Sequence, residues 1–191
     1  MASSDIPSDN IGGNGSVVTF GSFDGVHRGH QALLQEVVRI AKSRDLKSIA
    51  FTFDPHPALF HQARPGMQLL VGIDEKVAAI KACGIDEVEV IPYTAEFAAQ
   101  SPEYFVRDYL NKRYRARVVV LGGDARFGRE LSGDLTTLQE LGPKYGFELV
   151  RFDDVKPAQG AKRWSSTTAR AALNDGDMVL VAATLGRLHA I

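Results

Sequence analysis

The sequence predicts an α/β protein built on an open parallel sheet of about five strands with helices on both faces. Short apolar, β-branched runs recur along the chain, segments with helical spacing of apolar residues lie between them, and turn-forming residues separate the two. Such alternation of strand and helix is typical of a parallel sheet whose crossover helices cover both faces.

The elements follow one another in a regular order. The first strand is predicted at residues 17–20, and a helix with apolar positions from Leu33 onward begins near residue 31. Further strands are predicted at residues 47–53, 87–91, 116–121 and 147–152. Helices are predicted from Asp74, as the capping residue, to about residue 83, from 101 to about 112, and around 171–173.

Composition sets limits on the class of protein. The chain has 191 residues, of which 45% are hydrophobic, and 22 basic against 23 acidic residues give a net charge of −1. This is enough length for one globular domain with a real core, while the absence of a net positive charge disfavours nucleic-acid binding. The single cysteine excludes an internal disulfide and fits a reducing compartment.

The first residues have a different character from the rest. Residues 1–15 are polar and glycine-rich without an apolar core, so they predict a flexible leader rather than an export signal. No stretch suggests a membrane span. We therefore expect a cytoplasmic protein whose domain occupies residues 16–191.

The most informative segment is GSFDGVHRGH at residues 21–30, which joins the first strand to the first helix. A helix N-terminus offers unpaired N–H groups and partial positive charge, and glycines let the backbone approach a ligand. His27 and His30, three residues apart at the helix start, can both donate to phosphate oxygens. The pattern predicts a triphosphate site; the alternatives are a packed turn with incidental histidines, or zinc, which would need further ligands.

Three more motifs are predicted to lie near the same sheet edge or at a second helix start. They are Asp-Pro-His-Pro at 54–57, Gly-Gly-Asp-Ala-Arg-Phe-Gly at 122–128 and Arg-Trp-Ser-Ser-Thr-Thr-Ala-Arg at 163–170. In open α/β sheets ligands bind at the carboxyl edge, which supports a shared site. Taken singly, the alternatives are a stiff surface turn, a glycine-rich strand exit and an ordinary helix cap.

Together these motifs resemble a known family. Over residues 16–191 the chain is similar to the FMN adenylyltransferase module of prokaryotic bifunctional riboflavin kinase/FAD synthetases, within the HxGH nucleotidyltransferase superfamily. The resemblance implies a Rossmann-like fold and transfer of AMP from ATP to FMN, which gives FAD and pyrophosphate. It also implies Mg²⁺, held mainly by ATP phosphates and water rather than by protein ligands.

The resemblance assigns residues to roles. It implies that catalysis uses His27, His30, Ser166 and Arg170. It implies that ATP is bound by Gly21, Ser22, Phe23, Asp24, Gly25, His27, His30, Arg163, Ser165, Ser166, Thr167 and Arg170. It implies that FMN is bound by Pro55, His56, Pro57, Arg64, Asp124 and Phe127, with residues 58–70 as a lid. Ala125 and Trp164 depart from the family pattern, in which an aromatic and a small aliphatic residue are usual.

Alternatives to this function remain open at the level of sequence. The acceptor could be another phosphorylated compound, or the chain could be a non-catalytic nucleotide- or flavin-binding module. In bifunctional relatives a kinase module begins just after a segment like Leu185-Gly186-Arg187, and this sequence ends at Ile191. We therefore expect no riboflavin kinase domain here and a separate riboflavin kinase as the source of FMN.

Overall fold

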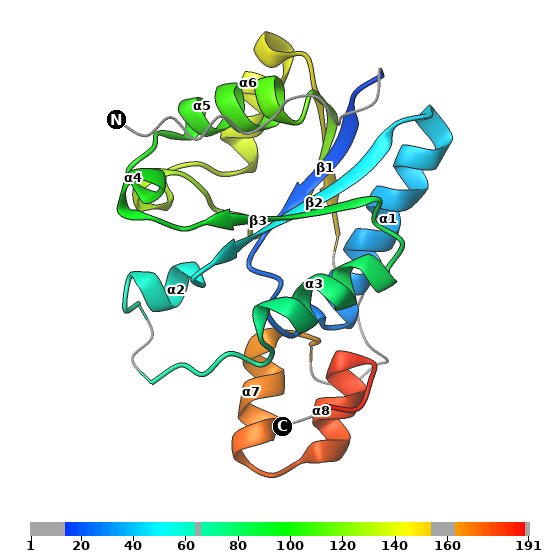
Figure 1. Cartoon of the computed structure of the whole chain (residues 1–191), viewed down its shortest axis with the longest axis vertical. Coiled ribbons are helices and arrows are strands. Elements are labelled where there is room, and N and C mark those ends of the chain that lie inside the picture. Colours follow the sequence, from blue (N-terminus) through cyan, green and yellow to red (C-terminus); the bar gives the residue numbers. More distant parts are fainter. Residues whose placement is uncertain (1–13, 64–65, 154–162, 190–191) are drawn as a thin grey trace.

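The protein is built on one five-stranded parallel sheet, which confirms the predicted fold class. The structure, a computed structural model, describes residues 14–63, 66–153 and 163–189 (Figure 1). The strands pair in the order β3-β2-β1-β4-β5, every neighbouring pair being parallel. Their bounds are β1 Ser16–Phe20, β2 Lys47–Asp54, β3 Glu87–Pro92, β4 Ala116–Gly122 and β5 Glu148–Phe152. Each predicted strand is present with its ends shifted by no more than two residues.

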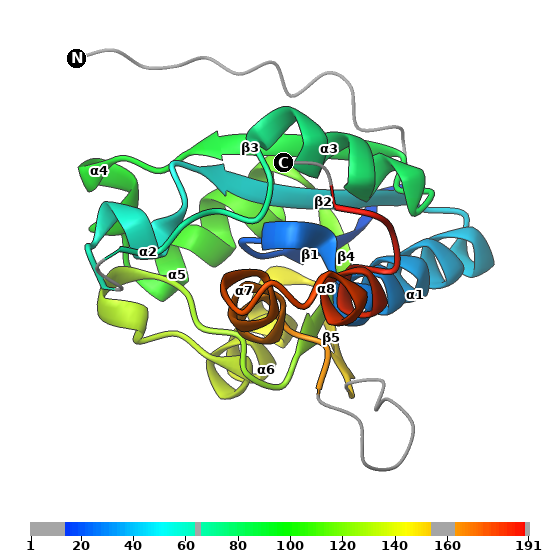
Figure 2. The ribbon, with the colours of Figure 1, turned by 90° about the horizontal axis from the view of Figure 1, so that it is seen from below.

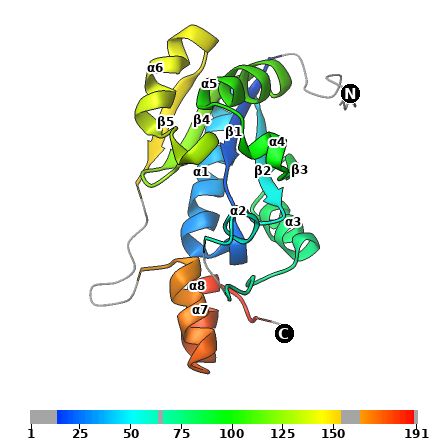
Figure 3. The ribbon, with the colours of Figure 1, turned by 90° about the vertical axis from the view of Figure 1, so that its left-hand side faces the viewer.

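Helices cover both faces of the sheet. On one face lie α1 (Arg28–Arg44) and α3 (Ile73–Ala82), and on the other lie α5 (Pro102–Phe105), the π-helix η3 (Val106–Arg113) and α6 (Leu135–Tyr145) (Figure 3). Because side chains alternate along a strand, Val17 of β1 packs in the α1 layer and Val18 in the opposite one. The central strands β1, β2 and β4 are largely buried on both faces, which explains their apolar runs, whereas the edge strands β3 and β5 are only partly buried and contain charged residues.

A helical hairpin lies beyond the carboxyl edge of the sheet. It consists of α7 (Ser166–Asn174) and α8 (Met178–Leu185), which pack against each other and against the 3₁₀ turn η2 (Asp24–Val26) that follows β1 (Figure 2). A small apolar cluster, formed by Leu70, Ala169, Ala172, Val181 and Leu185, joins this hairpin to the segment before α3. The hairpin therefore closes one side of the region where the predicted motifs converge.

Two predicted helices differ in detail from the structure. Asp74 was expected to cap the third helix, but the N-cap residue of α3 is Gly72, and Asp74 lies inside the first turn, where its charge still favours the helix N-terminus. The helix predicted at 101–112 begins at Pro102 with Ser101 as its cap, then continues as a π-helix from Val106. The remaining short helices are α2 (Pro57–Phe60), α4 (Ala95–Ala98) and η4 (Arg129–Leu131).

No helix in the described ranges is both long and apolar enough to cross a membrane. The predicted leader at 1–15 lies almost wholly outside the described residues, which begin at 14.

Candidate active site at the carboxyl edge of the sheet

The turn after β1 is held in an uncommon backbone conformation. Phe23, Gly25 and Val26 have φ values of 47°, 76° and 40°, in the left-handed region that a β-branched residue such as Val26 rarely adopts. A Cβ built on Gly25 would lie 2.7 Å from Leu70 Cδ1 and 3.1 Å from Leu185 Cδ2. Glycine is therefore required at 25 both by the backbone and by the side chains packed against it.

The two histidines lie together at the start of α1. His27 is the N-cap residue, and its Nδ1 accepts a hydrogen bond of 3.3 Å from the backbone N–H of His30. The imidazole rings stack, with centroids 3.6 Å apart, and Phe23 packs edge-on against His30. A Cβ on Gly29 would lie 3.1 Å from the His27 ring, so the absence of a side chain at position 29 leaves room for that ring. The pairing of the two histidines is confirmed, but His27 caps the helix instead of lying in its first turn.

Both imidazoles are neutral near pH 7. Burial lowers the pKa of His27 to about 4, with Arg163 lowering it further and Asp124 opposing the shift. Burial, His27 and Lys76 lower the pKa of His30 well below its ordinary value. Since Nδ1 of neutral His27 is an acceptor, its proton lies on Nε2. His30 Nδ1 is buried and has no hydrogen-bond partner among the described residues, which is unusual for a buried polar atom.

Asp24 links three segments that are far apart in the sequence. Its carboxylate is 1% exposed, forms an ion pair with Nη2 of Arg170, and accepts hydrogen bonds from the backbone N–H of Leu70 at 3.0 and 3.3 Å. Its carbonyl oxygen accepts a hydrogen bond of 2.8 Å from the Ser166 hydroxyl. Asp24 was predicted to bind ATP; in this structure its side chain is engaged by internal partners that hold α7 against the turn after β1.

The N-terminus of α7 lies beside the N-terminus of α1. The N-cap residue of α7 is Ser165, whose hydroxyl accepts from the Thr168 N–H at 3.0 Å. The carbonyl oxygen of Trp164 lies 3.6 Å from a Cβ built on Gly29, and the Arg28 guanidinium lies 5.7 Å from the centroid of the Trp164 ring. The unpaired backbone N–H groups of two helices are thereby brought to one place, an arrangement suited to anions.

The other residues predicted for ATP are near this junction. Ser22 accepts a hydrogen bond of 3.0 Å at its carbonyl from Thr52, and the Gly21 N–H donates to the Phe51 carbonyl at 3.2 Å. Thr167 is exposed in the first turn of α7. The side chain of Arg163 is 61% exposed and lies 3.6 Å from the carboxylate of Asp124.

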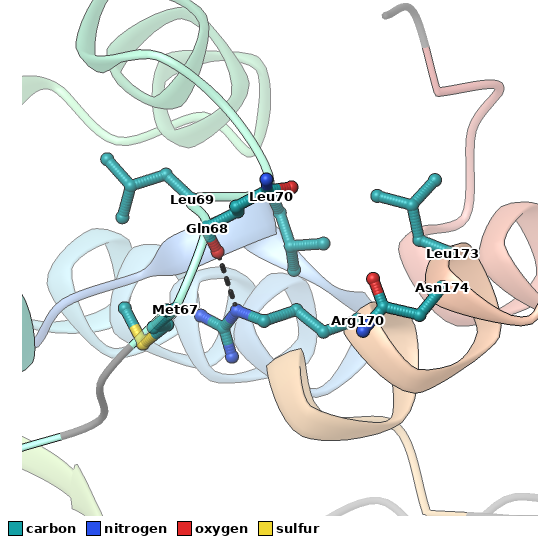
Figure 4. A pocket seen from close by; sticks show the side chains of 8 residues that line it. Met67, Gln68, Leu69, Leu70, Arg170, Leu173 and Asn174 are labelled. Atoms are coloured by element: carbon teal, nitrogen blue, oxygen red, sulfur yellow. Dashed lines mark hydrogen bonds between the residues drawn. The ribbon is translucent and has the colours of Figure 1, made fainter.

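A pocket of about 280 Å³ opens beside Arg170 (Figure 4). It is lined by Gly66, Met67, Gln68, Leu69, Leu70, Arg170, Leu173 and Asn174. Arg170 Nε donates to the carbonyl of Gln68 at 2.9 Å, so the guanidinium lies between α7 and the segment before α3. Residues 66–70 belong to the predicted lid, and Leu70, 3% exposed, fixes its end in the core.

The residues predicted for FMN are only partly brought together. His56 was expected to point outward, but it is 9% exposed because its Nδ1 accepts from the Ala58 N–H at 3.1 Å and caps α2, with Pro57 in the first turn. Pro55 is exposed beside it. Phe127 is 6% exposed and packs against Phe20 and Phe105 in the core, so little of its ring is open to a ligand.

Asp124, by contrast, is exposed at the end of β4, with 81% of its side chain accessible. Arg64 lies outside the described residues. Three or more His, Cys, Asp or Glu side chains suited to one metal ion do not occur together within the described ranges.

Sequence reasoning missed Lys76. This lysine of α3 is 2% exposed, and its Nζ donates to the Thr52 hydroxyl at 3.4 Å. Burial lowers its pKa, while Asp24 and Asp54 oppose that shift. The available signal was its spacing: Lys76 lies four residues before the buried Ile80, on the inward face of the helix.

Comparison with known proteins places the chain in a family. Residues 11–168 match the family model described as FAD synthetase. The chain is 36% identical to a bifunctional riboflavin kinase/FMN adenylyltransferase of Escherichia coli (strain K12). The 177 aligned residues cover 93% of this chain and 56% of that protein. It is 32% identical to a putative protein of the same name from Geobacillus thermodenitrificans (strain NG80-2), over 85% of either chain.

The fold is also found in a solved structure. A Streptococcus pneumoniae protein described as a macrolide-efflux protein superposes with a TM-score of 0.79 at 26% identity, over 94% of this chain and 58% of that one. The chain thus spans little more than half the length of the Escherichia coli relative and of this structure. With the family model matching most of its length, the chain belongs to the FAD synthetase family.

Proposed function

We propose that the chain transfers AMP from ATP to FMN, giving FAD and pyrophosphate. The observation that carries the proposal is the junction of two helix N-termini with the stacked pair His27 and His30, where His30 Nδ1 is buried without a partner. A buried, unpaired imidazole nitrogen beside two sets of helix N–H groups suits a bound polyphosphate. The names of the relatives supply the acceptor, FMN.

The proposed reaction is an in-line displacement at the α-phosphorus of ATP. A phosphate oxygen of FMN forms the new P–O bond, the bond from the α-phosphorus to the bridging oxygen breaks, and pyrophosphate leaves with that electron pair. The FMN phosphate is already ionised near neutral pH, so no strong general base is needed. Catalysis then depends on positioning the two substrates and on stabilising the charge that develops on the phosphoryl oxygens.

Neutral histidines suit this role. An imidazole whose pKa lies well below 7 donates a hydrogen bond without carrying a charge that would need a counter-ion in a buried site. We propose that His27 Nε2 and His30 donate to ATP phosphate oxygens. The backbone N–H groups at the start of α7, with Ser166 and Thr167 nearby, are proposed to hold the departing pyrophosphate.

We further propose that Arg170, beside Asp24, donates a hydrogen bond to a phosphoryl oxygen. Its Nε and Nη2 are engaged by Gln68 and Asp24, so Nη1 is the end of the guanidinium assigned to a phosphoryl oxygen. Asp124, Pro55, His56, Pro57 and Arg64 remain the proposed FMN side of the site. The exposed carboxylate of Asp124 is close enough to affect the pKa of His27, which supports assigning it to the place where the two substrates meet.

Mg²⁺ is proposed to enter with ATP. The carboxylate of Asp24 is engaged by Arg170 and Leu70, and the described residues offer no other acidic cluster, so the ion would be held by phosphate oxygens and water. When bound it supplies neutralisation of phosphate charge.

The test is direct product analysis. The purified chain is incubated with ATP, FMN and Mg²⁺, and FAD and pyrophosphate are quantified by chromatography. We expect equal amounts of the two products. Riboflavin in place of FMN serves as the matched control, because it lacks the phosphate that attacks, and it should give no FAD. ATP binding without FAD would reject the proposal and call for a screen of other phosphorylated acceptors.

A further inference from the structure

The ammonium of Lys76 is a buried cation with few partners. Among the described residues its Nζ donates one hydrogen bond, of 3.4 Å to the Thr52 hydroxyl, and no carboxylate oxygen there forms an ion pair with it. The Thr52 hydroxyl itself donates to the Ser22 carbonyl at 3.0 Å, so only a lone pair is left for the lysine. An ammonium has three donors, and leaving two of them unused inside a protein is costly.

Two carboxylates act on the charge of Lys76: that of Asp24, which is buried, and that of Asp54, which is exposed at the end of β2. The Asp24 carboxylate is already paired with Arg170 and hydrogen-bonded to Leu70. His27 and His30 are neutral near pH 7. Lys76 therefore has no ion-pair partner of its own among the buried described residues, and the Asp54 carboxylate that favours its charged form is exposed to solvent.

The position of Lys76 lies between the two halves of the proposed site. Thr52, its partner, lies on β2, two residues before Asp54 and the proline turn assigned to FMN. On the other side, Lys76 is close enough to His30 to lower the pKa of that imidazole, and α3 packs against η2. A buried cation thus lies between the proposed ATP phosphates and the proposed FMN side of the site.

We infer that Lys76 is a phosphate ligand, whose ammonium donates to a phosphoryl oxygen where the two substrates meet. This inference rests on the proposed function and extends it to a residue outside all of the motifs. Because Lys76 contacts Thr52 of β2, just before the turn assigned to FMN, the phosphate of FMN is the favoured partner. The phosphates of ATP are the alternative partner. In either case the anion supplies the hydrogen bonds that the buried ammonium lacks.

The experiment measures how much the phosphate groups of each substrate contribute to its binding affinity. Dissociation constants are determined by calorimetry for FMN against riboflavin and for ATP against adenosine. They are measured with the wild-type chain and with Lys76→Met and Lys76→Gln, which keep most of the side-chain volume. Lys81→Met, a lysine on the exposed face of the same helix, is the matched control. Melting temperatures verify that each variant is folded.

We expect the two Lys76 variants to lose about tenfold to a hundredfold of the affinity gained from the phosphate, the scale of one hydrogen bond to a charged group. Riboflavin and adenosine should bind as before, and Lys81→Met should resemble wild type. A loss confined to FMN assigns the acceptor phosphate, and a loss confined to ATP assigns the donor phosphates. Both results support the inference.

Three outcomes overturn it. The first is an unchanged phosphate contribution to affinity in folded variants, and the second is an equal loss of affinity for the ligands with and without phosphate. The third is failure of both variants to fold, which would give Lys76 a purely structural role. FAD formation by the wild-type chain is measured in parallel, so failure of the proposed function is seen separately from failure of this inference.

Discussion

The ion pair between Asp24 and Arg170 provides the sharpest test of how the site is held together. We consider Asp24→Asn, Arg170→Met and the double variant. Asparagine keeps an oxygen that can accept from the Leu70 N–H, and methionine keeps much of the apolar stem of arginine. The pair lies in a closed environment, with the Asp24 side chain 1% exposed and that of Arg170 16% exposed.

The expected loss in the free energy of unfolding follows from this burial. Removing one partner of a buried pair costs about 3–5 kcal/mol, and the partial exposure of Arg170 places this case at the lower end, about 3 kcal/mol for Asp24→Asn. A hydrogen bond between charged groups contributes about 1.5–3 kcal/mol, so we expect a coupling energy of about 2 kcal/mol in the double-mutant cycle. For a chain of this size the Asp24→Asn loss corresponds to a fall in Tm of about 6–12 °C.

The assay is urea unfolding at equilibrium, with the transition followed by two probes to verify two-state behaviour. A second cycle on Arg44 and Glu148 is the control, because that ion pair, at 2.7 Å, has side chains 45% and 53% exposed. Exposed pairs couple by about 1 kcal/mol or less. If the Asp24–Arg170 coupling were no larger than that of this surface pair, the buried link between α7 and the turn after β1 would not be the stabilising feature described here.

Three further predictions concern the turn and its histidines. Replacing His30 with Ala should lower kcat/KM for FAD formation by about two orders of magnitude, the scale of one preorganised donor, and a fall of less than threefold would exclude that role. The pKa of His27 is about 4 in the fold against 6.5 for the free side chain, so the unfolded chain binds more protons between these values. The free energy of unfolding should therefore fall as pH drops from about 7 to about 4, and His27→Asn, which retains a capping side chain, should weaken that dependence in urea titrations at several pH values. Gly25→Ala should destabilise by about 2–4 kcal/mol because the new methyl meets Leu70 at 2.7 Å, whereas Gly176→Ala, with φ of 73° and open space, should cost only about 1 kcal/mol; equal losses in thermal melts would refute the steric argument.

The sequence was sufficient to predict the strands and their parallel arrangement because the central strands, buried on both faces, read as apolar runs, and helical patterns separate the first four strands. The helix α6 was not predicted. It contains Gly142 and Pro143, which disfavour a helix interior, and is stabilised instead by a capping box between Asp134 and Thr137 and by burial of Leu138. The change to π-helix at Val106 likewise was not predicted, because the helical spacing of apolar residues does not distinguish a π-helix from an α-helix.

The geometry of the candidate site was predictable where its residues also define local structure. The positions of His27, His30 and Ser165 at two helix starts were predicted because a capped helix N-terminus has a sequence signature. His56 was expected to face outward, because the proline turn gives no indication that the imidazole caps the short helix after it. Lys76 was missed for a different reason: a lysine on a helix is usually exposed, and only the packing of α3 against η2 shows that this one is buried.

The arrangement of charge is consistent with the proposed polyphosphate site in a chain with a net charge of −1. Arg170 is paired with Asp24, Arg163 with Asp124, and Arg28 is hydrogen-bonded to the Ala183 carbonyl. Most of the donors assigned to phosphate are therefore neutral: backbone N–H groups at two helix starts and two uncharged imidazoles. In the proposed site the buried ammonium of Lys76 lies between the ATP and FMN halves. Since charge develops on the phosphoryl oxygens where the acceptor meets the α-phosphate, a single cation at that proposed junction would favour the transition state more than charges spread over the rim.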